Sequence, residues 1–367
     1  SHNIIGGLTP AARNIISANS EGISMWNDAS NNRVVGNFIG TDVTGTSGLG
    51  NNIEGVVLSD GASHNIIGGL TPAARNIISA NGEGIAVWGE ASNNHIVGNY
   101  IGTDVTGTSG IGNDLSGVRL IDGTSGNWIG GRRRGAGNVI SGSLRYGVMI
   151  MGGASQNHVQ GNYIGTQADG TSPLGNGRHG VLVSTGASDN TIGGIHVRPG
   201  LCNGPCNTIA FNGPPDTGWD GVRVFSGTGN MVIGNAVYSN AGLGIDLGDN
   251  GVTINDPGDI DEGPNNLQNF PLLTAASGWR LRIEGTLNST PETDFRLQFF
   301  ANSDCDPSGH GEGDTYLGTR WVHTDAGGNA SFSFRLWRRV SSGSFITATA
   351  TDSDNNTSEF SACVEKT

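Results

Sequence analysis

Short apolar triplets alternate with glycine and asparagine along the first two thirds of the chain. The segment Ser1–Asn19 returns almost unchanged at Ser63–Asn81, so this part of the sequence repeats with a period of 62 residues. A Gly-Ile-x-x-Trp segment follows in both copies, at Gly22–Trp26 and Gly84–Trp88. A fixed period of this length is typical of solenoids, in which stacked units share one core because no unit buries its apolar face alone.

Each repeat divides into shorter units that open with glycine and an apolar residue and that contain two asparagines. Gly and Asn enter left-handed backbone conformations more readily than other residues, so they mark the bends between strands. The pattern predicts three short strands per turn in a right-handed parallel β-helix, with turns stacked about 4.8 Å apart. The opening glycines are Gly22, Gly55, Gly84, Gly117, Gly147, Gly180, Gly221 and Gly244.

The pattern changes after Gly248. Residues 249–277 are acidic and rich in Pro, Gly and Asn, and we expect them to form a connector that caps the last turn. Residues 278–367 contain longer alternating strands, which favour an immunoglobulin-like β-sandwich. The sequence therefore predicts an all-β chain with a β-helix over 1–248, a capping connector over 249–277 and a sandwich over 278–367.

Four cysteines allow three pairings, and their clustering favours Cys202 with Cys206 and Cys305 with Cys363. Disulfides would place the protein outside the cytoplasm, and we expect it to be secreted or bound to the cell surface. The chain contains no signal peptide and no apolar run long enough to span a membrane. Because residue 1 falls inside a repeat, we expect the chain to be a segment of a longer secreted precursor.

The formal net charge of −13 argues against nucleic acid or an anionic membrane surface as the partner of the whole molecule. We expect a monomer whose partner is a polysaccharide and which requires no cofactor. The loop Arg132–Arg134 is a local basic exception. It is expected either to hold an acidic sugar or simply to be solvated.

The repeated Asn-x-[Ile/Val]-x-Gly-Asn-x-Ile-Gly-Thr motif resembles bacterial secreted proteins of the pectate-lyase-like right-handed β-helix superfamily. The ending at Gly244–Gly248, together with Pro264–Pro271 and Thr347–Phe360, is similar to the sandwich module that follows such helices. The resemblance implies the architecture. It does not fix the activity, because the superfamily includes hydrolases, lyases, epimerases, phage spikes and adhesins.

Stacked turns convert sequence positions into columns, and one set of columns collects groups capable of acid–base chemistry. Glycoside hydrolysis needs two carboxyl groups, and we expect Asp220 and Asp246 to supply them on the outer face of the helix, at an inverting-type separation. His179 and Arg223 would set the protonation of this pair. The protein is thus expected to be an extracellular polysaccharide-degrading enzyme, a glycoside hydrolase.

Three alternatives stay open. In a lyase or epimerase acting on a uronate glycan, His179 or Tyr146 would be the base and Arg223 would neutralise the substrate carboxylate. The same residues also fit stacked surface ion pairs with no catalytic role. A non-catalytic adhesin or carbohydrate-binding stalk would account for the near-identical early repeats.

Substrate binding is expected along the same outer face. Trp26 and Trp88 lie two turns apart, roughly 10 Å, and could stack on sugar rings unless the long loops cover them. Tyr146, Arg119 and Glu83 are further candidates. Glu21, Glu54 and Glu83 share a column and would repel one another, so either a cation or an arginine lies among them or they are solvated.

Two acidic segments are candidates for structural Ca²⁺, because each presents several carboxylate oxygens on a loop. Neither has the EF-hand spacing. The candidate ligands are Asp256, Asp259 and Asp261 in the first segment and Asp352 and Asp354 in the second.

Overall fold

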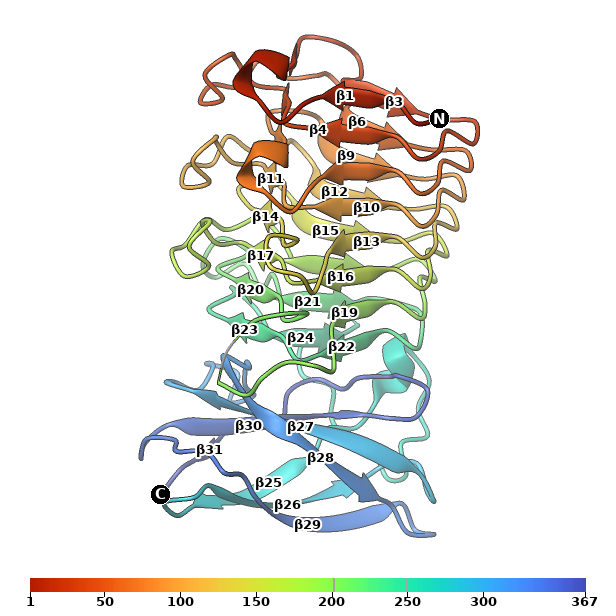
Figure 1. Cartoon of the computed structure of the whole chain (residues 1–367). Helices are drawn as coiled ribbons and strands as arrows, with labels where there is room; N and C mark the ends of the chain where they lie inside the picture. Colours follow the sequence, from red (N-terminus) through yellow and green to blue (C-terminus); the bar gives the residue numbers. More distant parts are fainter. Residues whose placement is uncertain (201, 249) are drawn as a thin grey trace.

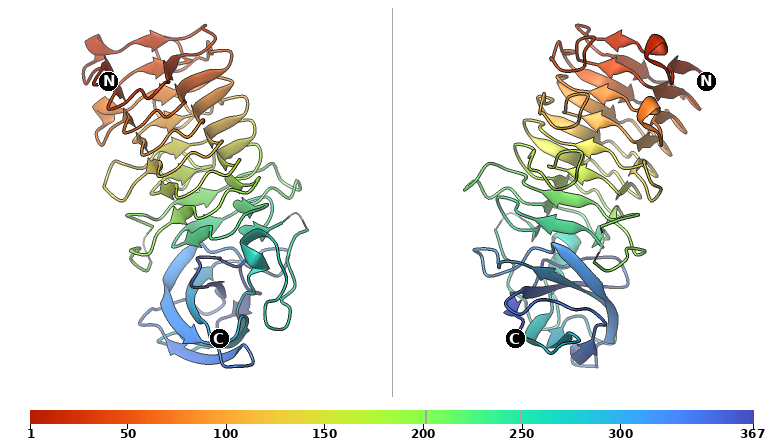
Figure 2. Two further views of the ribbon diagram at one scale, coloured as in Figure 1. Left: turned by 90° about the vertical axis from the view of Figure 1, so that its right-hand side faces the viewer. Right: turned by 60° about the vertical axis from the view of Figure 1, so that its left-hand side comes forward.

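The computed structural model describes residues 1–200, 202–248 and 250–367. Three parallel eight-stranded sheets run along the molecule, and two smaller antiparallel sheets lie at the C-terminal end (Figure 1). The turns stack along one axis in the further views as well (Figure 2). The predicted fold class is confirmed: the chain is all-β, with a parallel β-helix followed by antiparallel sheets.

Each turn of the helix contributes one strand to each sheet. Sheet A contains β1 (Ile4–Gly6), β4 (Arg33–Val35), β7 (Ile66–Gly68), β10 (His95–Val97), β13 (Trp128–Gly130), β16 (His158–Gln160), β19 (Thr191–Gly193) and β22 (Met231–Ile233). Sheet B contains β2 (Ile15–Ile16), β5 (Phe38–Ile39), β8 (Ile77–Ile78), β11 (Tyr100–Ile101), β14 (Val139–Ile140), β17 (Tyr163–Ile164), β20 (Thr208–Ala210) and β23 (Ala236–Tyr238). Sheet C contains β3 (Ile23–Met25), β6 (Glu54–Leu58), β9 (Glu83–Val87), β12 (Ser116–Leu120), β15 (Tyr146–Ile150), β18 (Val181–Val183), β21 (Val222–Val224) and β24 (Ile245–Leu247).

Asparagine ladders close the corners between the sheets. Asn138 illustrates the geometry: its Oδ1 accepts hydrogen bonds from the amide and side-chain nitrogens of Asn99, at 2.9 and 3.1 Å. Its Nδ2 donates to the carbonyl of Ile96 at 2.8 Å and to Oδ1 of Asn162 at 2.9 Å. Every interior rung therefore satisfies backbone groups that a bend would otherwise leave unpaired.

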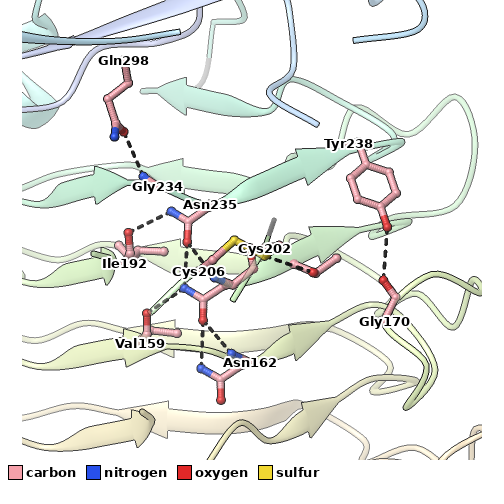
Figure 3. Close-up of a disulfide and its surroundings, with 12 residues drawn as sticks. Val159, Asn162, Gly170, Ile192, Cys202, Cys206, Gly234, Asn235, Tyr238 and Gln298 are labelled. Atoms are coloured by element: carbon pink, nitrogen blue, oxygen red, sulfur yellow. Dashed lines mark hydrogen bonds between the residues drawn. A yellow bond between two sulfur atoms is a disulfide. The ribbon is translucent and has the colours of Figure 1, made fainter. Parts of the chain in front are cut away.

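Both expected disulfides are present. Cys202 pairs with Cys206 in a loop beside sheet B, next to the ladder asparagines Asn162 and Asn235 (Figure 3). Cys305 pairs with Cys363 in the C-terminal region. Disulfides persist in oxidising compartments, so they indicate a location outside the cytoplasm.

The C-terminal region is sandwich-like. One antiparallel sheet contains β25 (Leu272–Ser277), β26 (Arg282–Asn288) and β29 (Asn329–Arg335). The other contains β28 (Thr315–His323), β27 (Asp294–Asn302), β30 (Phe345–Thr351) and β31 (Val364–Glu365). The three predicted domain ranges stay a prediction. Within the range expected to be a connector, residues 272–277 form a strand that pairs with β26.

Short 3-10 turns complete the secondary structure of the described residues. Two of them occupy equivalent loops of the first two repeats, at η1 (Pro10–Ala12) and η2 (Pro72–Ala74). The third, η3 (Pro264–Leu267), lies where the connector meets the last turn. There, Oδ1 of Asn265 accepts from the amide of Asn230 at 3.0 Å and so extends the asparagine ladder beyond the helix.

Side chains of the C-terminal region cover the open end of the β-helix. Oε1 of Gln298 accepts from the amide of Gly234 at 2.9 Å (Figure 3). Glu312 accepts from the amides of Ser239 and Asn240 at 2.6 and 3.1 Å. Glu359 accepts from the amides of Leu247 and Thr253 at 3.0 and 2.9 Å. Amides that the last turn would leave unpaired are thereby satisfied, which protects the sheet edges.

The contact of Glu312 and Glu359 with the end of the β-helix is expected to make the stability of the protein depend on pH. Burial raises the pKa of Glu312 and of Glu359 to about 7, although the amide donors oppose the shift. A carboxyl whose pKa is higher in the folded state stabilises that state fully below its unfolded pKa of 4.5, and the contribution is lost as pH rises through about 7. The melting temperature should therefore fall between pH 5 and pH 8.

The matched control is the double variant Glu312→Gln, Glu359→Gln, in which this decline should be much smaller. Some slope should remain, because burial also raises the pKa of Asp259 to about 6. A wild-type melting temperature that rises over the same range, or an unchanged slope in the double variant, would contradict the assignment.

Candidate functional site

The outer face of sheet C is hollowed near its N-terminal end. Along β3 the side chains alternate as predicted, since Ile23 and Met25 are buried whereas Ser24 and Trp26 are exposed. Val57, in register with Ser24 on the next strand, is short and lines the floor with it. A groove with a cavity volume of about 560 Å³ results, within the size range of ligand pockets.

Glu21, Glu54 and Arg119 line this groove, and Glu83 contacts Arg119 from the adjacent strand. Glu54 and Glu83 are in register on the adjacent strands β6 and β9, and only 8% and 4% of their surfaces are exposed. Arg119, on β12, places Nε 2.6 Å from Oε2 of Glu83 and Nη2 3.7 Å from Oε1 of Glu54. Of the alternatives expected for the glutamate column, the structure therefore shows an arginine among the glutamates, and that arginine is Arg119.

The environments of the two carboxyls differ. Burial raises the pKa of Glu54, the negative charge of Glu21 raises it further, and Arg119 opposes both. Burial also raises the pKa of Glu83, but here Arg119 opposes the shift through both its charge and a direct hydrogen bond. Arg119 lies closer to Glu83 than to Glu54, so its charge favours the ionised form of Glu83 more strongly.

Tryptophans flank these charged groups. The Trp26 side chain is 63% exposed and Trp88 is half-buried, and both line the groove with Ser59 between them in the column. The alternative in which long loops cover both rings is excluded for Trp26. Glu21 hydrogen-bonds Ser24 at the N-terminal edge of the groove. The arrangement offers flat apolar faces beside buried charge, as a sugar chain requires.

The predicted carboxylate pair lies elsewhere and is covered. Asp220 and Asp246 are each 1% exposed, and His179 is 2% exposed, so the expectation of a solvent-facing pair is wrong. Arg223 joins the two carboxylates, with Nε 2.8 Å from Asp220 Oδ2 and Nη2 2.5 Å from Asp246 Oδ2. The catalytic roles predicted for these four residues stay predictions.

The physical reason for this burial is the loops around the last turns. Oδ1 of Asp220 accepts from the amide of Leu243 at 2.8 Å, and the amide of Asp220 donates to Nδ1 of His179 at 2.9 Å. Trp219 packs edge-on against the His179 ring, with centroids 4.8 Å apart. Tyr146 stacks on the other side at 6.0 Å and accepts from Arg178 at 3.1 Å. The structure thus brings the predicted group together, but beneath an aromatic cover.

Of the two acidic segments, the first forms a cluster. Asp256, Asp259 and Asp261 each offer an oxygen, and these oxygens all lie within 4.8 Å of one another. Within the described part of the chain, Oδ1 of Asp256 and Oδ1 of Asp261 are buried without a hydrogen-bond partner. Three hard oxygen ligands, two of them otherwise unsatisfied, fit a divalent cation such as Ca²⁺.

The second acidic segment, which contains Asp352 and Asp354, stabilises a turn through hydrogen bonds. Asp352 accepts hydrogen bonds from the amides of Asp354 and Asn356 at 2.9 and 2.8 Å, and from the Asn356 side chain at 2.7 Å. Asp352 and Asp354 join no group of three metal-ligating side chains among the described residues. Asp352 therefore caps a turn, which accounts for the local richness in Asp and Asn.

Glu54 lies at the site, but the sequence analysis placed it only in the glutamate column and did not include it among the candidate binding residues. The sequence did contain a signal for this contact, but the residues occupy different columns. Arg119 lies two positions after the opening glycine of its strand, whereas each glutamate lies one position before the opening glycine of its own strand. A long arginine side chain crosses that offset between neighbouring strands. The Asp220–Arg223–Asp246 group shows the same offset, so the pattern alone does not distinguish a surface groove from a buried ion network.

Comparison with known proteins yields similarity of shape only. No family model and no curated protein sequence matches the chain. Among solved structures, a mutant of the periplasmic alginate epimerase AlgG is similar over 63% of this chain and 45% of its own, with 17% identity and a TM-score of 0.37. Tailspike protein 2 of an Escherichia coli O157:H7 bacteriophage is similar over 93% of this chain and 57% of its own, with 9% identity and a TM-score of 0.29.

The enzymatically active domain of bacteriophage CBA120 tailspike protein 2 is similar over 92% of this chain and 53% of its own, with 13% identity and a TM-score of 0.26. The chain thus spans about half the length of each of these proteins.

None of the helical turns in the described residues has the length and apolarity needed to cross a membrane.

Proposed function

We propose that the protein is an extracellular glycoside hydrolase that binds a polysaccharide in the groove on sheet C. The observation that carries the proposal is the pair Glu54 and Glu83, two buried carboxyls with raised pKa that share Arg119. Glu54 and Arg119 line the groove together with the two tryptophans. Hydrolysis of a glycosidic bond needs one carboxyl that is protonated and one that is ionised. The differing environments of Glu54 and Glu83 supply this difference.

In the proposed mechanism, Glu54 protonates the leaving oxygen. Glu83, held ionised by Arg119, attacks the sugar carbon as the leaving group departs and forms a glycosyl ester. Water, deprotonated by Glu54, then attacks the same carbon, which releases the sugar and regenerates the Glu83 carboxylate. Adjacent parallel strands lie about 4.8 Å apart, which favours the close pair of retaining enzymes, about 5–5.5 Å, over the wider inverting pair. Products should therefore keep the anomeric configuration of the substrate. Sugar rings would stack on Trp26 and Trp88 on either side of the cleaved bond.

The activity is tested on a panel of neutral and acidic polysaccharides with two readouts. Reducing-sugar release without absorbance at 235 nm is the expected result, because a hydrolase creates no double bond. A rise at 235 nm would instead support a uronate lyase in which Arg119 neutralises the substrate carboxylate. Glycan binding without either signal would support the non-catalytic adhesin.

Calcium is expected to stabilise the protein through the Asp256, Asp259 and Asp261 cluster. Three neighbouring carboxylates repel one another, and Ca²⁺ would remove that repulsion and supply a partner for the unsatisfied oxygens. Adding millimolar Ca²⁺ to chelator-treated protein should raise the melting temperature by several degrees.

The Asp261→Asn variant should lose most of this gain, whereas Asp354→Asn, which alters the acidic segment that caps a turn, should keep it. An equal gain in wild type and in Asp261→Asn would contradict the site.

A further inference from the structure

A second groove, on the outer face of sheet B, departs from the repeat in a way that creates a basic site. It has a cavity volume of about 560 Å³ and is lined by Arg75, Tyr100, the loop Arg132–Arg134 and Tyr163. No aspartate or glutamate occurs among the described residues that line it. The groove therefore concentrates positive charge in a chain whose net charge is −13.

The first two repeats show what the unmodified arrangement looks like. Arg13 stacks on the Phe38 ring with its guanidinium carbon 3.9 Å from the ring centroid, and Arg75 stacks on Tyr100 at 3.7 Å. The Nε atoms of these arginines donate to the carbonyls of Gly36 and Gly98, at 3.2 and 3.3 Å. In both repeats the outward aromatic face is therefore already occupied by an arginine of the protein itself.

The third repeat breaks this arrangement at one residue. Gly137 stands where the first two repeats have Arg13 and Arg75, and a Cβ at that position would collide with the carbonyl oxygen of Gly161. No arginine stacks on the equivalent ring, Tyr163, among the described residues. The three arginines of this repeat lie instead in the preceding loop, exposed at the rim of the cavity.

The ring of Tyr163 is the one suited to a sugar ring. Tyr163 lies two turns from Tyr100, whose own outward face is covered by Arg75. Arginine forks bind carboxylate and sulfate groups in bidentate fashion, and aromatic faces bind sugar rings. The loop closed by Cys202–Cys206 forms the far wall and is held in place by its disulfide (Figure 3).

We propose that this groove binds an anionic glycan, with an acidic sugar ring on Tyr163 and its anionic group on Arg132–Arg134. The site lies on a different sheet from the groove lined by Glu54 and Arg119, so it is independent of the proposed hydrolase activity. Its role is to hold an acidic chain on the protein. Electrostatic attraction at this groove counteracts the repulsion from the rest of the acidic surface.

The test measures binding by calorimetry with three hexasaccharides: oligogalacturonate, its neutral methyl ester and a sulfated galactan. Wild type should bind the uronate at least tenfold more tightly than the ester. Preference for the sulfated chain over the uronate would assign the same site to sulfated glycans. The triple variant Arg132→Ser, Arg133→Ser, Arg134→Ser should lose the difference between acid and ester.

Three controls separate this proposal from general charge and from the active site. The triple variant Arg282→Ser, Arg335→Ser, Arg338→Ser removes the same charge from the exposed surface of the C-terminal region and should bind like wild type. Tyr163→Ala should weaken acid and ester alike, whereas Tyr163→Phe should not. Glu83→Gln should bind the acid unchanged even if the protein proves to be no hydrolase.

Equal affinity for acid and ester in wild type, or wild-type binding by the Arg132–Arg134 variant, would overturn the proposal. Tighter binding of a DNA oligonucleotide than of either acidic glycan would also overturn it.

Discussion

Glu83→Gln is expected to lower kcat by about a thousandfold on whichever polysaccharide the wild type cleaves. Glutamine keeps the size of the side chain but removes the carboxylate that is proposed to attack the sugar, and such groups contribute on the order of 10²–10⁴ in rate. Substrate binding should change little, because the flanking tryptophans remain. Steady-state kinetics of reducing-sugar release, with circular dichroism to confirm folding, measures the effect.

Asp246→Asn is the matched control for a buried carboxylate. Asp246 is 1% exposed and paired with Arg223, so its neutralisation should lower the melting temperature and leave the activity of the folded protein within a few fold. The opposite outcome, a folded but inactive Asp246→Asn and an active Glu83→Gln, would restore the assignment of catalysis to Asp220 and Asp246.

Asn138→Ala is expected to destabilise the β-helix by about 3 kcal/mol or more. It removes the acceptor of two hydrogen bonds from Asn99 and the donor to the Ile96 carbonyl, all in the buried interior. Each buried polar group left without a partner costs about 1–3 kcal/mol. Equilibrium unfolding in denaturant, with the slope compared between variants, measures the loss.

The control for Asn138→Ala is the variant Asn14→Ala in the same asparagine ladder. Asn14 occupies the exposed first rung, and its side chain makes one hydrogen bond, from Nδ2 to Oδ1 of Asn37, which also accepts from the Asn14 amide. Asn14→Ala should therefore cost no more than about 0.5 kcal/mol, as at an ordinary surface position. Equal losses at the two positions would show that the ladder does not stabilise the helix through buried hydrogen bonds.

The repeat made most of the fold predictable. A strand in a solenoid contacts the same strand of the next turn, so the local pattern at Gly22–Trp26 already specifies register and the inward direction of Ile23 and Met25. The cysteine pairs followed from spacing for the same reason, because each pair lies within one loop or one module. Contacts that are local or periodic are visible in sequence.

The site was harder to predict, since burial there depends on segments outside the repeat. The column argument correctly placed Asp220, Arg223 and Asp246 together, but it did not show that Trp219 packs against His179 or that the Leu243 amide binds Asp220. Conversely, the hollow beside Glu54 depends on the shape left around the short side chain of Val57, which a pattern of residue types does not show. The same limit applies to the groove beside Tyr163, whose other walls come from the loop Arg132–Arg134 and from the loop that contains Cys202 and Cys206.

The position of bound substrate tests the central claim most directly. A crystal structure of the Glu83→Gln protein soaked with an oligosaccharide of its substrate should show sugar rings on Trp26 and Trp88, with a glycosidic oxygen within hydrogen-bonding distance of Glu54. An oligosaccharide bound instead over Tyr146 and Trp219, with the groove on sheet C empty, would contradict the account.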